Sequence, residues 1–492
     1  MQRQNDQIVA WFANNFSDGR PEMPDLPGDV ILPPEDDVTE GNTSPEDLAP
    51  DMEELPLPPP PPIGGISPED LQGDDLIDLP PSMVENLLPE QIGALEPDVV
   101  GEFSPEQFAL IPDASFEGFD AQQIESMRPD LVEGIRPGQF GELPVDAFQG
   151  FDSEHVMVLP PEVFEEMQPD QLAAMSSESF EGFDAEQIES MRPELLEGLQ
   201  PGQFGELPAD AFQGFDSEQV RVLPSDVFKT MHPDQLAELP VEAFDGFESE
   251  QIGSLRPKMF EGIRPAQFES LPVQAFDGLD AKQIDKISPK LMGTFDRDRF
   301  GALTPDAVGG FDPKQFKKLA PDALEKVEAD QLAEMMPKIF RSMKLGQFDA
   351  LPTESFEGFQ AKQIKKMAGP LVASIEPEEF DLLPADAIAG FKPKSVKKLS
   401  GDDFARLDKT QMSGWNSKTL SKLKESHVEH IPAEAFEGLT QAQAKKMKIR
   451  FASLLSKDQV QNLDPEIFDV IGSKVFDEFE GLLSQQQLDL FG

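Results

Sequence analysis

The sequence predicts an all-α protein, an elongated solenoid of very short helices built on an eight-residue repeat. Three observations predict this fold class: an apolar residue recurs every eight positions, a helix-start signal precedes it in most repeats, and proline recurs about once per repeat. A proline inside a helix removes a hydrogen bond and clashes with the preceding turn. Each repeat, or octad, is therefore expected to form about one to one and a half helical turns.

Two ladders of apolar residues define the repeat. The first ladder runs from Leu76 to Phe476 at intervals of eight without insertion or deletion, which makes 51 octads. The second ladder follows three residues later in each octad, as at Ile263 and Leu271. Residues three apart share one face of a short helix, and one octad is too small to bury that face by itself. Neighbouring octads must bury it, as the repeats of a solenoid do.

Both ends of a helix are encoded within one octad. In SPEQFALI (104–111) a serine is followed by proline and, three positions after the serine, by glutamine, which is the pattern of an N-cap with a capping box. Glycine often follows two residues after the first-ladder residue, as at Gly118, Gly134 and Gly150. We expect these glycines to stop the helix in a left-handed conformation.

The sequence also repeats with a longer period of two octads. Glutamine stands directly before the first-ladder residue at every second octad over long stretches, for example at Gln91, Gln107, Gln123 and Gln139, with His155 at the next such position. This alternation favours two octads per coil and leaves three or four open. With two octads per coil the rod would be about 200 Å long, and with four about half that. Residues 116–160 and 180–224 are nearly identical, which indicates duplication of a block of eight octads.

The chain divides into four predicted regions. Residues 1–16 form an amphipathic docking segment, in which Ile8, Trp11, Phe12 and Phe16 are the candidate partner-binding residues. The alternative for this segment is a frayed terminus that packs on its own solenoid. Residues 17–65 are acidic and proline-rich and predict a disordered tether. The octapeptide-repeat solenoid follows at 66–479, and residues 480–492, where the register breaks, form a C-terminal cap.

Charge and composition exclude several classes of protein. The chain has 94 acidic and 40 basic residues, a net charge of −54, and residues 1–228 hold 51 acids against six arginines. Direct binding to nucleic-acid phosphates is therefore not expected. There is no cysteine, which excludes disulfides and thiolate chemistry. There are only four histidines, which leaves few residues for acid–base or metal chemistry. We expect no membrane span, because no apolar run approaches about 18 residues. We also expect no cleavable signal peptide, because residues 1–16 lack the uninterrupted apolar core of a secretory signal.

Three groups of polar residues are candidate sites. DRDRFG (296–301) begins like a calcium loop but has Phe300 at the fifth position and Ala307 at the twelfth, so it is not an EF-hand. His427 and His430 could meet one metal, but a pair of solvated histidines is expected instead. His155 and His232 are assigned no role.

Lysine-rich octads, such as those at 312–319 and 392–399, are interleaved with acids along the chain. They predict weaker self-repulsion in the C-terminal half rather than a basic patch. A further hypothesis is head-to-tail self-association, in which these lysines attract the acidic half of a neighbouring copy.

Function is predicted from the regularity of the chain. No phosphate-binding glycine loop, nucleophile elbow or dinucleotide fingerprint is present, so an enzyme is not expected. The first hypothesis is a non-enzymatic structural protein, a rod attached by its N-terminus to a larger assembly such as a phage virion appendage or a bacterial surface structure. The alternatives are a DNA-mimicking decoy of a DNA-binding protein and an exported calcium-dependent adhesin. No resident cofactor is expected, only weak binding of Ca²⁺ to surface acids.

The units SPEQF, DAEQI and LPADAF resemble the uncharacterised octapeptide-repeat proteins of the Ser/Thr-Pro-Glu-Gln type found in bacteria and their phages. The resemblance covers the solenoid only. It implies a helical solenoid and carries no functional residues over to this chain.

Overall fold

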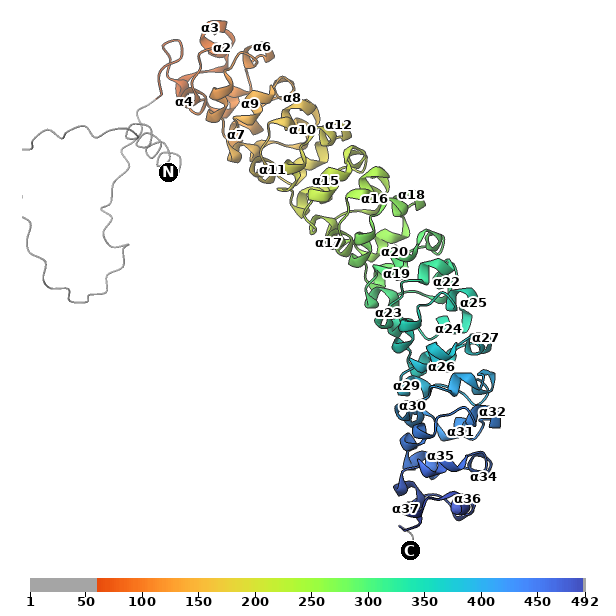
Figure 1. The fold of residues 1–492 in the computed structure, drawn as a ribbon. Helices are drawn as coiled ribbons and strands as arrows, with labels where there is room; N and C mark the ends of the chain where they lie inside the picture. Colours follow the sequence, from red (N-terminus) through yellow and green to blue (C-terminus); the bar gives the residue numbers. More distant parts are fainter. Residues whose placement is uncertain (1–59, 490–492) are drawn as a thin grey trace, which may run out of the picture. The chain divides into compact units, whose positions relative to one another are not determined.

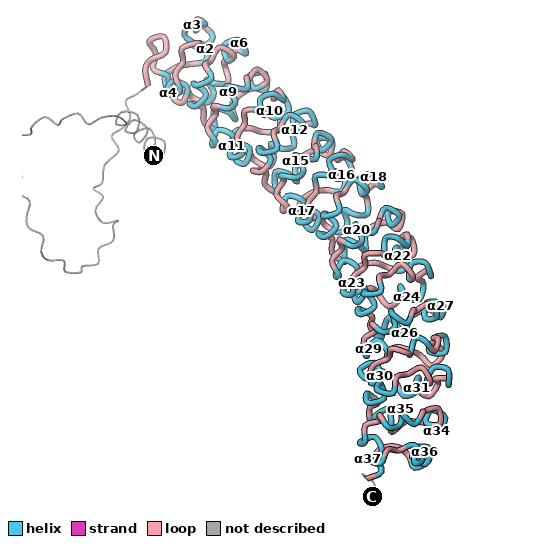
Figure 2. Tube along the Cα trace, in the orientation of Figure 1, coloured by secondary structure: helices cyan, strands magenta, loops and turns pink. Residues whose placement is uncertain are grey.

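The computed structural model describes residues 60–489, and the segment Pro60–Gly492 forms one compact unit. Short helices joined by short loops make up this unit (Figures 1 and 2). The α-helices have four to seven residues, as in α8 (Pro129–Val132) and α36 (Ser473–Phe479). The 3-10 helices have three to six, as in η8 (Val227–Lys229) and η4 (Val145–Gly150). Within 60–489 the only β-pairing is an isolated bridge between Ile63 and Ile66, so the predicted all-α solenoid of very short helices is confirmed.

Three octads make one coil. The helix α7 (Ala121–Glu125) packs on η4, and α10 (Ser153–Val158) packs on η6 (Glu178–Gly182). In each pair the two elements lie three octads apart along the chain. The two-octad coil favoured by the alternation of octads is therefore wrong. The alternation reflects which octads carry a cross-coil hydrogen bond, whereas the number of sides is set by how the helices stack.

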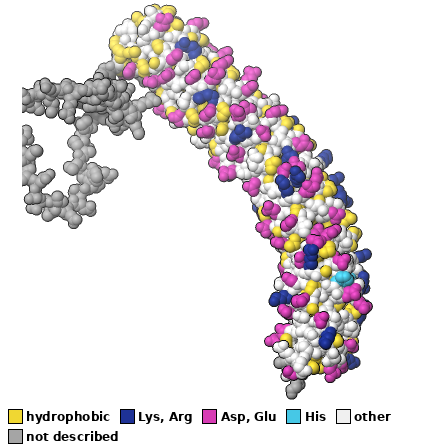
Figure 3. Space-filling model, in the orientation of Figure 1, with side chains coloured by type: hydrophobic (Ala, Val, Ile, Leu, Met, Phe, Trp, Pro, Cys, Tyr) yellow, Lys and Arg dark blue, Asp and Glu magenta, His cyan; other side chains and the backbone are white. Residues whose placement is uncertain are grey.

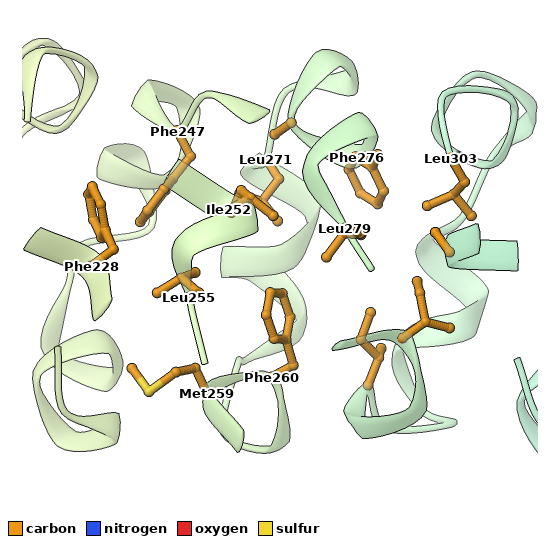
Figure 4. Close-up of a cluster of buried hydrophobic side chains, with 14 of the residues drawn as sticks. Phe228, Phe247, Ile252, Leu255, Met259, Phe260, Leu271, Phe276, Leu279 and Leu303 are labelled. Atoms are coloured by element: carbon orange, nitrogen blue, oxygen red, sulfur yellow. The ribbon is translucent and has the colours of Figure 1, made fainter. Parts of the chain in front are cut away.

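The two ladders form one continuous core. Every first-ladder residue from Leu76 to Phe468 is buried, and the second ladder is buried except at Leu79, Met447 and Ile471, which are partly exposed. Figure 4 shows how side chains from successive coils meet, with Phe228, Ile252 and Phe276 following one another along the stack. Most phenylalanine pairs meet edge to face or tilted, which is an arrangement that aromatic pairs favour. No hydroxyl is needed in this core, consistent with the absence of tyrosine.

The predicted helix starts are confirmed. The Ser104 hydroxyl accepts from the Gln107 N–H at 3.2 Å at the start of α6 (Pro105–Phe108), and the Asp120 carboxylate accepts from the Gln123 N–H at 2.9 Å. Proline occupies the first helical position where no N–H is required, as in α8.

The predicted helix stop is wrong. Among residues 60–489 only Gly64 and Gly65 have positive φ. Gly118 lies inside the 3-10 helix η3 (Asp113–Gly118), and the helix ends because the next residue, Phe119, is extended at φ −72° and ψ 143°. A Cβ on Gly118 would lie 2.1 Å from the Pro89 carbonyl oxygen in the preceding coil. Glycine is required there because two backbones approach closely, and not because of its conformational freedom.

The packed unit begins before the expected boundary at residue 66. Ile63 is buried, and the Gln91 side chain donates to the Pro61 carbonyl at 2.9 Å. At the other end, η19 (Glu480–Leu482) and α37 (Gln485–Leu488) follow α36. The Gln487 amide donates to the Val460 carbonyl, 27 positions earlier, whereas the equivalent bond of Gln459 to Val428 spans 31. The register break seen in the sequence thus shortens the last coil.

Candidate interaction surfaces

A buried glutamine links each coil to the preceding one. The side-chain oxygen of Gln123 accepts from the Asp120 N–H at 3.1 Å, which completes the capping box of its own helix. Its Nε2 donates to the carbonyls of Ile92 and Leu95 in the preceding coil, both at 2.8 Å. One buried amide therefore satisfies three backbone groups in two coils.

The same contact recurs along the stack and is called the glutamine ladder. Its members donate to backbone carbonyls of the preceding coil and are Gln91, Gln107, Gln123, Gln139, Gln171, Gln187, Gln203, Gln219, Gln235, Gln251, Gln267, Gln283, Gln315, Gln331, Gln347, Gln363, Gln411, Gln443, Gln459 and Gln487. The sequence contained the signal for the ladder, because these positions carry glutamine rather than the glutamate that a capping box also accepts. A carboxylate has no donor for the two carbonyls.

Two histidines replace ladder glutamines, and both differ from expectation. His155 is buried, its Nδ1 accepts from the Asp152 N–H at 3.3 Å, and its Nε2 lies 2.8 Å from the Met127 carbonyl in the preceding coil. His427 is also buried, and its Nδ1 accepts from the Lys424 N–H at 3.2 Å. Only His430 of the expected solvated pair is exposed. A neutral imidazole has one acceptor and one donor, so it can substitute for the amide.

Glu379 stands at a ladder position in α28 (Pro377–Asp381). Its carboxyl group is buried and accepts from the Glu376 N–H at 2.8 Å. Burial raises the pKa of Glu379 to about 7, and the nearby carboxylates of Glu376, Asp349 and Glu378 act in the same direction. The protonated acid resembles glutamine because it has a donor, whereas the ionised acid does not.

The coils around Glu379 differ from the rest of the stack in other respects, and residues 376–430 are called the substituted segment. Asp403 is buried with a raised pKa caused by desolvation. The Trp415 ring stacks on Phe404 at 5.9 Å, and its Nε1–H has no hydrogen-bond partner within residues 60–489. The Phe404 ring also stacks on His427, at 5.1 Å. Desolvation lowers the pKa of His427, which keeps the ring neutral.

The calcium-like motif is a helix cap. The Asp296 carboxylate accepts from the N–H groups of Asp298 and Arg299 at the start of α20 (Arg297–Gly301). Arg299 stands at a ladder position and donates to the Glu269 carbonyl of the preceding coil at 2.7 Å. No group of three or more His, Asp or Glu residues that could hold a metal ion occurs in the described part of the chain.

Charge is segregated along the stack. The first coils, residues 66–127, contain fifteen acids and no basic residue, and are called the acidic end. Figure 3 shows acidic side chains over these coils. Almost all of them are exposed, as at Glu85, Asp98 and Glu117.

The opposite charge gathers on one side of three consecutive coils near the other terminus. The octads around Val396, Leu420 and Ala444 follow one another at intervals of three octads, and the Lys424 ammonium donates to the Lys397 carbonyl across the first of these steps. The segments 392–400, 416–424 and 440–448 contain no acid and ten exposed lysines, which define the lysine face: Lys392, Lys394, Lys397, Lys398, Lys418, Lys422, Lys424, Lys445, Lys446 and Lys448. None of the ten forms an ion pair within residues 60–489. The acids that interleave with these octads in sequence lie on the other sides of the coil, so a basic patch exists where none was expected.

The lysine face is hollowed between α31 (Ser417–Leu420) and α33 (Gln441–Ala444). A surface depression of about 520 Å³ lies there, lined by Lys418, Lys446, Ser417, Asn416 and Thr440 among others, and no acid lines it. The ammonium groups of Lys418 and Lys446 and the Ser417 hydroxyl therefore border a concave area that is suited to carboxylates. The Asn416 amide and the Thr440 hydroxyl already donate within the chain.

The predicted docking residues Ile8, Trp11, Phe12 and Phe16 lie outside the described residues. The same is true of nearly all of the predicted tether. Of the part that is described, no helix is long and apolar enough to cross a membrane.

Comparisons with known proteins identify no family. No protein-family model matches the chain, and no curated protein matches it. The solved structures that align with it include two APUM23 complexes, which do so weakly. The APUM23–GGAAUUGACGG complex is 13% identical over 85% of this chain and 90% of that chain with a TM-score of 0.16, and the APUM23–GGAUUUGACGG complex is 11% identical over 82% and 87% with a TM-score of 0.17. TM-scores this low carry no argument about fold or function.

Proposed function

We propose that the protein is a non-enzymatic structural rod that holds its N-terminal segment at one end of a stack of coils in a larger assembly. The observation that carries this proposal is the use of the buried polar side chains. Within residues 60–489 each buried Gln, Ser, Thr, His, Asp and Glu side chain is hydrogen-bonded to backbone, most of them in the glutamine ladder. A catalytic site needs polar groups that face a substrate, and these groups face the next coil or their own helix.

The regular stack is suited to spanning a distance. With three octads per coil, residues 60–489 make about 18 coils, and packed helices at about 8 to 10 Å spacing give a length of about 150 to 180 Å. Each coil contacts only its neighbours, so coils can be added without changing the chemistry of the rest.

Attachment through residues 1–16 rests on their sequence. Ile8, Trp11, Phe12 and Phe16 lie at helical spacing in a segment that stands apart from the octads. Short amphipathic segments of this kind dock their apolar side chains in a partner's groove. The assembly we propose is a phage virion or a bacterial surface structure.

The test is an affinity pull-down from the native source with bound proteins identified by mass spectrometry. The wild type is compared with W11A/F12A and with a control, Met157→Ala, which removes a 65% exposed apolar side chain from the solenoid. Capsid, tail or envelope components retained by the wild type and the control, and lost by W11A/F12A, support the proposal. Equal retention by all three proteins contradicts it.

A second candidate function is a decoy that mimics DNA, and the acidic end favours it. Its exposed carboxylates have no basic residue among them, so this end presents only negative charge, as the phosphates of a DNA duplex do. Competition separates the two candidates: a decoy displaces labelled duplex DNA from a DNA-binding enzyme of the native source, and a structural rod does not.

A further inference from the structure

We infer that the lysine face docks on the acidic end of a second copy of this chain, so that copies join head to tail. The inference does not rest on the proposed attachment, because it uses only residues of the described coils. It gives a role to two strongly charged surfaces of the stack.

The lysine face lacks counter-charges of its own. Its ten lysines are exposed, form no ion pair within residues 60–489, and come from segments without a single acid. Some basic residues of the same half are paired across coils, as in the contact between Lys326 and Asp298 at 2.5 Å and that between Arg406 and Glu378 at 2.9 Å. Lysines on another side of the coil, such as Lys317 and Lys365, are also exposed, so the lysine face is distinguished by three consecutive coils that contribute ten lysines and no acid to it. The ten ammonium groups repel one another, and a carboxylate-bearing partner relieves that repulsion.

The acidic end is the complementary surface. It has fifteen acids and no base, and the first basic residue that follows it is Arg128. The depression between α31 and α33 offers the Ser417 hydroxyl beside the ammonium groups of Lys418 and Lys446 for carboxylates that enter it. A carboxylate that meets both an ammonium and neutral donors is held more strongly than one that meets a charge alone.

The two surfaces cannot meet within one copy. About eleven packed coils, residues 128–391, separate the acidic end from the lysine face, and most of them are bonded to their neighbours by the glutamine ladder. The contact must therefore join two copies through different surfaces. Such a contact leaves one surface of each kind free at the ends of every assembly and permits open chains of copies.

A second copy is favoured over a nucleic acid or an anionic membrane. Residues 1–228 carry 51 acids against six arginines, and this charge repels any extended polyanion that approaches the lysine face. A second copy carries the same overall charge but presents its acids at one end, so a staggered contact brings opposite charges together and keeps the two acidic halves apart.

The test is sedimentation velocity on the full chain over a range of protein concentrations. At about 20 mM NaCl we expect association that is lost at about 300 mM, because screening shortens the range of the charges. The reversed variant is K397E/K398E/K445E/K446E, for which we expect association to weaken at least about tenfold. Association of this variant equal to that of the wild type would overturn the inference.

The matched control reverses four lysines on another side of the coil. Lys317, Lys318, Lys365 and Lys366 are exposed and hold the same two octad positions as the reversed lysines. K317E/K318E/K365E/K366E therefore changes the net charge equally and leaves the lysine face intact. We expect its association to change less than about twofold. An equal loss in both variants would show that net charge alone governs association and would overturn the inference.

A charge swap gives the strictest test. E85K/D98K/E106K/E117K reverses four exposed acids of the acidic end. Each reversed variant should be monomeric alone, and a mixture of this variant with K397E/K398E/K445E/K446E should associate again. Monomers in the mixture would contradict the inference.

Two further experiments test whether something other than the acidic end binds the lysine face. If D36N/D37N/E53Q/E54Q, in the acidic segment before the coils, abolished association, the occupant would be that segment and not the acidic end. If the wild type stayed monomeric at low salt but bound a labelled 20-base-pair DNA duplex through the lysine face, the surface would be a nucleic-acid site. Either result would overturn the inference.

Discussion

Two regions of the stack solve the same bonding problem with different side chains. From Gln171 to Gln283 the cross-coil position is glutamine at every second octad. In the substituted segment the same position holds Glu379 and His427, and the core beside it holds Trp415. The comparison teaches that the position requires one acceptor and one donor rather than a particular residue. Of the three side chains only glutamine supplies both at every pH, so we expect the cross-coil bonds of the substituted segment to depend on pH.

The largest loss of stability is expected where a glycine allows the backbones of two coils to approach closely. A Cβ at Gly278 would lie 1.8 Å from the Ser249 carbonyl oxygen, so Gly278→Ala must push two coils apart. We expect a loss of about 3 to 5 kcal/mol in the free energy of unfolding, measured by urea denaturation. The control is Gly293→Ala, where a Cβ would meet nothing within 4 Å. A loss at Gly293 as large as that at Gly278 would contradict the packing argument.

The second-largest loss of stability is expected when one glutamine of the ladder between Gln171 and Gln283 is removed. Gln219→Leu leaves the Asp216 N–H and the carbonyls of Ile188 and Met191 without a side-chain partner. We expect a loss of about 2 to 4 kcal/mol, since buried polar groups are left unpaired. Hydrogen exchange should show the loss concentrated in the two coils that the amide joins. The control Gln213→Leu, at an exposed residue, should change stability by less than about 0.5 kcal/mol.

Restoring a glutamine of the ladder in the substituted segment should increase the free energy of unfolding rather than decrease it. The pKa of Glu379 is about 7 in the folded chain and lower when unfolded, so the folded state binds more protons between these values. Stability is therefore present at low pH and is lost as the pH rises toward 7. We expect Glu379→Gln to stabilise the protein by about 1 to 3 kcal/mol at pH 8 and to have little effect at pH 4. Thermal melts of both proteins across this range measure the difference, and a gain that did not depend on pH would contradict the assignment.

His427 should respond to pH in the other direction. Its pKa is lowered in the folded chain, so the unfolded state binds more protons below about pH 6.5. Stability contributed by the neutral ring is present at higher pH and is lost as the pH falls. His427→Gln should remove this loss of stability at acid pH. The double variant with Glu379→Gln tests both at once: its pH profile between pH 5 and 8 should be flatter than that of the wild type.

Removal of divalent cations should have the smallest effect. The acids of the described coils are spread over the surface, and Asp296 is occupied as a helix cap. The melting temperature should differ by less than about 2 °C between 1 mM CaCl₂ and 1 mM EDTA, if binding is only weak and diffuse. A larger shift would favour the calcium-dependent adhesin.

The fold could be predicted because its signals are local. Proline and a capping residue start each helix, and the apolar ladders, such as the one containing Phe268 and Phe276, identify the core from spacing alone. The number of octads per coil could not be predicted, because the contacts that decide it join residues in different coils. The role of Gly118 was missed for the same reason, since its neighbour Pro89 lies in another coil.

The lysine face could not be predicted, because its position depends on the number of octads per coil. Lys397, Lys422 and Lys446 belong to octads that are separated in sequence by octads rich in acids. Only a coil of three octads places them on one side. The sequence shows how much charge each half carries, whereas the structure shows on which side it lies.

The odd number of octads per coil constrains how the rod can change its length. Two kinds of octad alternate along the chain, so with three sides each octad stacks on one of the other kind, as Gly118 stacks on the octad that contains Gln91. An inserted single octad would bring like kinds together and place a side chain where glycine is needed. Octads gained in pairs preserve the stacking but turn everything beyond them about the axis. The duplicated block of eight octads equals two full coils and two further sides, so its insertion lengthened the rod and also rotated the lysine face relative to the acidic end.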